Sequence, residues 1–188
     1  MVWQAKHGRE ESFPVPFDTT GEPYVALARY SFENFTRTGR RVTVPDGLPV
    51  EMTARRAGAF VSLHEHGELR GCIGTIAATE DNLAEEIISN AIAACSRDPR
   101  FPPVEVSELA DLVCSVDVLG DAEPCELEDL DPRRYGVIVS NGWSRGLLLP
   151  DLEGVDTVMQ QVDIARRKAG IGPNEPVRLE RFEVVRHE

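Results

Sequence analysis

Apolar side chains recur at helical spacing in three segments of the chain. These segments are Glu22–Arg37, Glu80–Arg97 and Asp156–Ala169. In each of them an apolar residue returns every three or four positions, which places these residues on one face of a helix. Thr79 stands where a residue would cap the second helix, and Gly170 stands where a glycine would end the third. We therefore expect three amphipathic helices.

Strand-like runs occur in pairs that are joined by turn residues. Two hairpins are expected, around Gly67 and around Asn141-Gly142, because such glycine-containing turns join antiparallel strands. Their strands are Gly58–His64 with Leu69–Thr75, and Gly136–Ser140 with Trp143–Leu149. Further strands are expected at Leu112–Leu119, at Val177–Val185 and, as a short element, at Val42–Val44. Hairpins without strand–helix–strand alternation indicate an α+β fold, with an antiparallel or mixed sheet flanked by helices.

The length of 188 residues suits one substantial core, or a core with a smaller lobe. Residues 1–20 are polar and contain Pro14 and Pro16, so we expect a flexible N-terminal segment, followed by one folding unit over residues 21–188. The segment Gly120–Asp131 is expected to be an acidic connection.

The charge of the chain disfavours two classes of partner. A net charge of −12 opposes binding to nucleic acid and to acidic membrane surfaces, both of which need a concentrated basic surface. Arg40, Arg41, Arg55 and Arg56 are the one local concentration of basic residues, and their role stays open.

The sequence also predicts a cytoplasmic protein. No apolar window is long enough to span a bilayer, and residues 1–20 lack the apolar run of a secretory signal. The four cysteines are far apart and form no C-x-x-C pair, so reduced thiols are expected.

Motifs for common cofactors are absent, and we expect no cofactor. The chain has neither a Walker-type loop nor a G-x-G-x-x-G segment that opens a helix after a strand. His64-Glu65-His66 lacks the helical spacing of a zinc protease motif, and the sequence offers no evident third ligand. A metal site is therefore not expected.

The segment Leu69–Gly74 is the most informative one, because Gly71 and Gly74 interrupt an otherwise well-packed strand. A glycine within a strand usually marks a bulge, or a close approach by another backbone or a ligand. A regular hairpin register places Cys72 opposite Val61, with His64 on the other face of the sheet. In that register no histidine activates Cys72 unless a bulge reverses the faces. The alternative is that Cys72 is a small buried strand residue.

The segment Asp98–Pro103 follows a helix end and contains three prolines. Such a stiff loop can hold polar groups at a site, and Asp98, Arg100 and Phe101 are its candidates. The alternative is a helix stop, in which Asp98 and Arg100 pair locally and Phe101 fills the core. The two interpretations are compatible with each other.

Several segments together resemble one family. They are Gly58–Leu63, Leu69–Gly74, Asp98–Pro103, Tyr135-Gly136-Val137, Gly146–Pro150 and Lys168-Ala169-Gly170. In this order they are similar to the AMMECR domain family, whose prokaryotic members are called AmmeMemoRadiSam system protein A. The resemblance runs from about Pro23 to Phe182 and implies an α+β fold with a larger and a smaller lobe. It also implies a cleft around Leu69–Gly74 and partnership with a Memo-like protein and a radical-SAM protein, but no established catalytic activity.

Three functions follow, in order of preference. The first is a binding module that docks a protein or a small-molecule ligand through Arg70, Gly71, Cys72, Gly74, Asp98, Arg100 and Phe101. The second is an enzyme that uses Cys72 as a nucleophile or redox thiol, with Arg70 stabilising the thiolate or an oxyanion. The third is nucleic-acid binding, which the net charge opposes.

Overall fold

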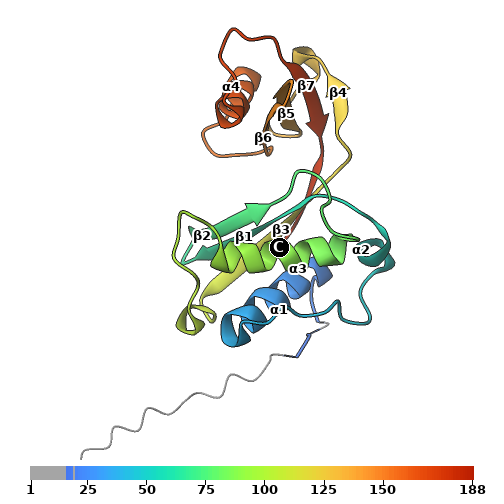
Figure 1. Cartoon of the computed structure of the whole chain (residues 1–188), viewed down its shortest axis with the longest axis vertical. Helices are drawn as coiled ribbons and strands as arrows, with labels where there is room; N and C mark the ends of the chain where they lie inside the picture. Colours follow the sequence, from blue (N-terminus) through green and yellow to red (C-terminus); the bar gives the residue numbers. More distant parts are fainter. Residues whose placement is uncertain (1–15, 19) are drawn as a thin grey trace, which may run out of the picture.

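The computed structural model describes residues 16–18 and 20–188. The flexible segment predicted for residues 1–20 therefore lies almost entirely outside the described residues. Within the described part the chain forms two antiparallel four-stranded sheets with helices packed on them, which confirms the α+β class (Figure 1). None of the described helices combines the length and the apolar character that crossing a membrane requires.

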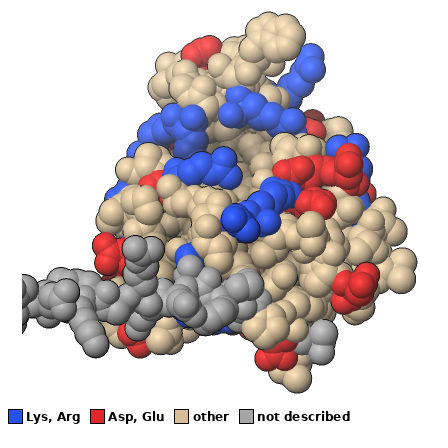
Figure 2. Space-filling view, turned by 60° about the horizontal axis from the view of Figure 1, so that its bottom comes forward, with Lys and Arg blue, Asp and Glu red and all other residues tan. Residues whose placement is uncertain are grey.

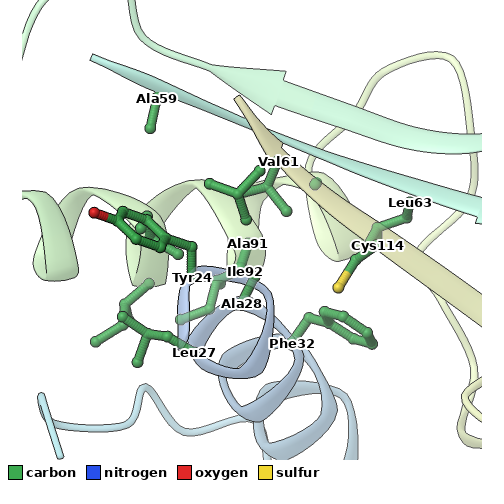
Figure 3. Close-up of a cluster of buried hydrophobic side chains, with 14 of the residues drawn as sticks. Tyr24, Leu27, Ala28, Phe32, Ala59, Val61, Leu63, Ala91, Ile92 and Cys114 are labelled. Atoms are coloured by element: carbon green, nitrogen blue, oxygen red, sulfur yellow. The ribbon is translucent and has the colours of Figure 1, made fainter. Parts of the chain in front are cut away.

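The larger part of the molecule contains the first sheet. Its strands, in spatial order, are β2 (Glu68–Gly74), β1 (Ala59–Glu65), β3 (Leu112–Leu119) and β8 (Val184–His187). The helices of this part are α1 (Pro23–Thr38), α2 (Val50–Ala54) and α3 (Leu83–Ser96), and a 3₁₀ turn covers Val106–Glu108. Figure 3 shows Val61 and Leu63 of β1 directed toward Phe32 and Ala28 of α1. Because side chains alternate along a strand, Phe60, Ser62 and His64 of β1 lie on the opposite face.

The smaller part contains the second sheet and one helix. Its strands, in spatial order, are β4 (Glu123–Cys125), β7 (Arg178–Phe182), β5 (Gly136–Asn141) and β6 (Ser144–Leu148). Helix α4 (Val158–Ala169) begins with a capping box between Thr157 and Gln160 and ends at Gly170 in the left-handed conformation. Val162 and Ala165 of α4 pack on this sheet and form a second core. A 3₁₀ turn covers Leu127–Asp129.

The single strand predicted over Val177–Val185 is wrong. The chain forms β7, leaves the second sheet at Glu183 and enters the first sheet as β8. The N–H of Gly120 donates to the carbonyl oxygen of Glu183, so the two crossings of the chain lie side by side (Figure 1). A small apolar cluster fills this junction: Leu119, Ile138, Leu147 and Phe182. Apolar and charged residues follow one another through Val177–Val185 without a turn residue, so the sequence pattern does not reveal that the chain changes sheets.

Three further predictions are corrected. Helix α3 begins at Leu83 and not at Glu80, because the Asn82 side chain accepts the N–H of Glu85 and caps the helix there. Thr79 instead bonds to the buried carboxylate of Glu86. No strand forms at residues 42–44; Val42 and Val44 pack against the core from the irregular segment between α1 and α2. The acidic connection Gly120–Asp131 contains β4, whose isolated alternation is too short to predict.

Candidate functional site

A β-bulge interrupts the first hairpin. His64 pairs with Leu69, but the next pair joins Leu63 to Gly71, so Arg70 is an extra residue in β2. Such an insertion reverses the faces of all strand residues beyond it.

The bulge brings Cys72 to the face that carries His64. The predicted pairing of Cys72 with Val61 is wrong, because Cys72 pairs with Ser62. The Ser62 hydroxyl lies 3.2 Å from the Cys72 sulfur. Since Ser62 and His64 are two positions apart in β1, their side chains and that of Cys72 share one face of the sheet. The histidine that the regular register places on the other face thus shares the face of the thiol, two positions along β1 from the residue that pairs with Cys72.

The glycines of β2 are required by close packing. A Cβ atom on Gly71 would lie 2.3 Å from the carbonyl oxygen of Ala94 in α3. A Cβ on Gly74 would overlap the ring of Phe60. The sequence pattern therefore marks both a bulge and a close approach, and at Gly71 the approaching group is the backbone of a helix.

Asp98 and Arg100 hold the backbone of Cys72 from both sides. One carboxylate oxygen of Asp98 accepts the N–H of Cys72 at 2.9 Å, and the Arg100 guanidinium donates to the Cys72 carbonyl oxygen at 3.2 Å. Arg100 also donates to both oxygens of Asp98, at 2.9 and 2.6 Å. These hydrogen bonds hold the pKa of the buried Asp98 carboxyl well below its usual range, against the opposing effect of burial. The local pairing expected for this loop is therefore present.

Arg70 points away from Cys72 and into the loop that follows α3. Its guanidinium donates to both oxygens of Glu108, at 2.6 and 3.1 Å, and to the carbonyl oxygens of Pro102 and Pro103. These bonds hold the pKa of Glu108 below its usual value. The Arg70 side chain also lies 6.0 Å from the ring centre of Phe101. Arg70 therefore fastens the loop to β2 and is not placed to stabilise a Cys72 thiolate.

A cleft of about 1070 Å³ separates the exposed face of the first sheet from the smaller part. Its floor carries Cys72, Ser62 and Ser115 in one row, because Ser62 pairs with Cys72 on one side and with Ser115 on the other. Strand β6 and the end of α4 form the opposite wall. The apolar lining comes from both parts and includes Phe60, Leu69, Ile76, Leu149 and Leu152. Small polar groups and apolar surface therefore meet in one cleft.

Four cationic side chains converge on this cleft: Arg100, Arg145, Lys168 and Arg186. Arg186 pairs with Asp117, and Arg145 pairs with Glu180. Figure 2 shows one face of the molecule on which Lys and Arg side chains gather where the smaller and larger parts meet. For a chain of net charge −12, this is an unusual concentration of positive charge.

The predicted site residues occupy two layers. Cys72, Gly74 and Arg100 line the cleft. Gly71, Asp98, Arg70 and Phe101 lie outside its lining: they pack β2 on α3 and secure the loop behind it.

Sequence reasoning missed Arg145, Lys168 and Arg186. Lys168 belongs to a segment that carries the family resemblance, and Arg145 directly precedes another, which was a usable signal. Arg186 has no local signal, because its position depends on the pairing of β8 with β3, which sets it opposite Asp117.

The expectation that no third metal ligand lies near His64-Glu65-His66 is corrected in part. Among the described residues, Glu65, His66 and Asp111 bring their ligand atoms within 4.8 Å of one another. Asp111 directly precedes β3, in which Leu112 pairs with Glu65. His66 and Asp111 are exposed, and His64 is not part of the group.

Three of the four basic residues named around α2 are engaged in side-chain contacts within the chain. Arg41 pairs with Glu85, Arg56 donates to the carbonyl oxygen of Glu80, and Arg55 donates to that of Leu119. These three arginines fasten loops to the larger part, so their side chains are not all free to form the concentrated basic patch that phosphate backbones require.

Comparison with known proteins agrees with the family resemblance. The AMMECR1 family model matches residues 25–187. A protein of Thermotoga maritima is 53% identical over 168 residues, which cover 88% of this chain and 97% of the relative. A protein of Clostridium acetobutylicum is 51% identical over 167 residues, but these cover 88% of this chain and only 36% of that longer relative.

A solved structure shows the same fold. The crystal structure of an uncharacterized protein from Pyrococcus horikoshii matches with a TM-score of 0.80 at 32% identity, and the match covers 87% of this chain and 88% of that one. The family match, the Thermotoga relative and this shared fold all extend over most of the chain. The chain belongs to the AMMECR1 family.

Proposed function

We propose that this chain is a binding module whose cleft between the two sheets holds a small-molecule ligand. One observation carries the proposal: a cleft of about 1070 Å³ whose lining combines Cys72, Gly74 and Arg100 with apolar and cationic groups from the smaller part. Ligand sites in proteins are typically concave and largely apolar, with a few convergent polar groups. Because Asp98 and Arg100 fix the backbone of Cys72, this edge of the cleft is ordered before any ligand arrives.

The family resemblance adds two partners to the proposal. The module acts with a Memo-like protein and a radical-SAM protein. The matched part forms only 36% of the Clostridium relative, so in that protein the domain is joined to a long stretch of further chain. A domain that occurs both nearly alone and within a longer chain fits a module that works beside other proteins.

A second candidate function is an enzyme that uses Cys72 as nucleophile or redox thiol. The β-bulge favours it, because Cys72 and His64 share the face that borders the cleft. The Ser62 hydroxyl at 3.2 Å from the sulfur is a further polar neighbour. A nucleophilic cysteine needs a base within hydrogen-bond reach, and in this arrangement His64 is the side chain to test.

Alkylation of Cys72 tests the binding proposal. Cys72 and Cys125 are half-buried, while Cys95 and Cys114 are buried. In a Cys125→Ser background, iodoacetamide should label Cys72, and the low-molecular-weight fraction of a cell extract should slow that labelling at least threefold. The matched control is Cys125 in a Cys72→Ser background, which lies outside the cleft and should be labelled at an unchanged rate.

The same assay separates the alternatives. Protection by the purified Memo-like protein, and not by the small-molecule fraction, would make the cleft a protein-docking surface and overturn the small-molecule proposal. A mass adduct on Cys72 after incubation with the fraction, lost in His64→Gln, would favour the enzyme. Equal labelling rates in every arm would refute the cleft as a binding site.

A further inference from the structure

The cationic groups of the cleft differ in how they are neutralised. Arg100 and Arg186 each use Nε and Nη2 in a pair with a buried carboxylate, Asp98 and Asp117 respectively. In each of these arginines Nη1 has no partner among the described residues. A guanidinium fixed in this way loses little conformational entropy when it donates a further hydrogen bond. These arginines therefore offer pre-ordered donors, but their charge is largely balanced.

Lys168 supplies the charge that is not balanced. Its ammonium group has neither an ion pair nor a hydrogen bond within residues 16–18 and 20–188. The sequence contains only two lysines against 18 arginines, and Lys168 is the one in the described part. A lysine in the last turn of a helix can also serve the helix end. Here backbone groups already cap the helix end, since the N–H groups of Gly170 and Ile171 donate to the carbonyl oxygens of Arg167 and Arg166.

The other residues that line the cleft indicate which groups a ligand carries beside its charged group. Phe60, Leu149 and Leu152 give the cleft apolar surface on both sides, and Ser62 and Ser115 give its floor hydroxyl groups. Among the side chains that line the cleft, only Asp117 and Glu188 are anionic, and Asp117 is paired with Arg186. A strongly acidic chain that keeps one cleft nearly free of unpaired carboxylates is arranged to admit an anion.

We infer that the cleft takes a small amphipathic anion, whose apolar body packs between the two sheets and whose carboxylate or phosphate group meets Lys168. The inference rests on the proposed function and names its ligand class. The ammonium group contributes a point charge that suits either anion, and the free Nη1 groups of Arg100 and Arg186 supply directional hydrogen bonds.

Three naphthalene probes of matched shape test the inference: 1-naphthyl phosphate, 1-naphthoate and neutral 1-naphthol. Calorimetric titration should show the better of the two anions binding at least fivefold more tightly than 1-naphthol, and it reports which anionic group the cleft prefers. Lys168→Ala should weaken the anions about fivefold, as expected for the loss of one partly solvated ion pair, and leave 1-naphthol unchanged. Lys168→Arg should restore most of the affinity.

Arg167→Ala is the matched control, because Arg167 is a cation in the same turn of α4 that does not line the cleft. It should leave all three affinities unchanged. An equal loss in Arg167→Ala and Lys168→Ala, or equal affinity for 1-naphthol and the anions, would overturn the inference. If 1-naphthol and the anions bind equally but all protect Cys72 from alkylation, the cleft still binds small molecules and only the charge preference fails. If none of the three probes binds, both the ligand class and the role of Lys168 are rejected.

Discussion

At the scale of single residues, Asp98 links the candidate site to the stability of the fold. Its buried carboxylate accepts hydrogen bonds from Cys72 and Arg100. The folded pKa of Asp98 is held below the unfolded value of about 3.9. The pair therefore stabilises the fold fully above that unfolded value, and this contribution is lost as the pH falls toward the folded pKa.

We predict that Asp98→Asn lowers the free energy of unfolding by about 1–2 kcal/mol at pH 7, discounted because Arg100 is half exposed. The stability difference between Asp98→Asn and wild type should shrink as the pH falls from 5 to 2, because the Asp98 carboxyl of the unfolded wild-type chain takes up a proton there while that of the folded chain stays ionised. Urea unfolding at several pH values measures it. Asp111→Asn, at an exposed acidic residue, is the control and should change stability little. A deficit independent of pH would show that shape, and not charge, gives Asp98 its role.

At the scale of elements, both hairpins pack closely against a helix in the same way. In each, a strand with an Arg-Gly pair lies under the helix that follows it: Gly71 of β2 under α3, and Gly146 of β6 under α4. A Cβ on Gly146 would lie 2.1 Å from the carbonyl oxygen of Ala165. The sequence predicts the hairpins and helices themselves, because periodicity and turn residues are local signals. The glycines of β2 indicate a bulge or a close approach, but they do not show that Arg70 is the inserted residue, because its partner Glu108 lies 38 positions away in the chain.

Replacing Gly71 by alanine tests this packing. We predict that Gly71→Ala lowers the free energy of unfolding by about 1–3 kcal/mol, because the added methyl group meets rigid helix backbone. Thermal and urea unfolding measure the loss. Gly67→Asn is the control in the same hairpin: Gly67 has open space around it, and asparagine tolerates its positive φ of 87°. A larger loss in Gly67→Asn than in Gly71→Ala would contradict the packing argument.

At the scale of the whole molecule, the site exists only because the chain crosses between the two sheets. The floor of the cleft belongs to the larger part, whereas Arg145 and Lys168 belong to the smaller one. The sequence indicates each sheet through its hairpins, but the crossing at Glu183 falls within a segment of mixed apolar and charged residues, free of turn residues, that reads as one strand. The sequence does not place Arg145 and Lys168 at the cleft for this reason: their position is set by how the two parts are joined.

Phe182 is the main side chain at that junction. It is 2% exposed, packs with Ile138 and Leu147, and covers Gly136 with its ring. We predict that Phe182→Ala lowers the free energy of unfolding by about 3–5 kcal/mol, as the truncation of a large buried side chain does. Because each part retains a core of its own, the loss should separate one unfolding transition into two in calorimetry. Phe182→Leu should preserve a single transition. One transition merely shifted to lower temperature in Phe182→Ala would mean that the backbone crossings, and not this cluster, couple the two parts and hold the cleft in shape.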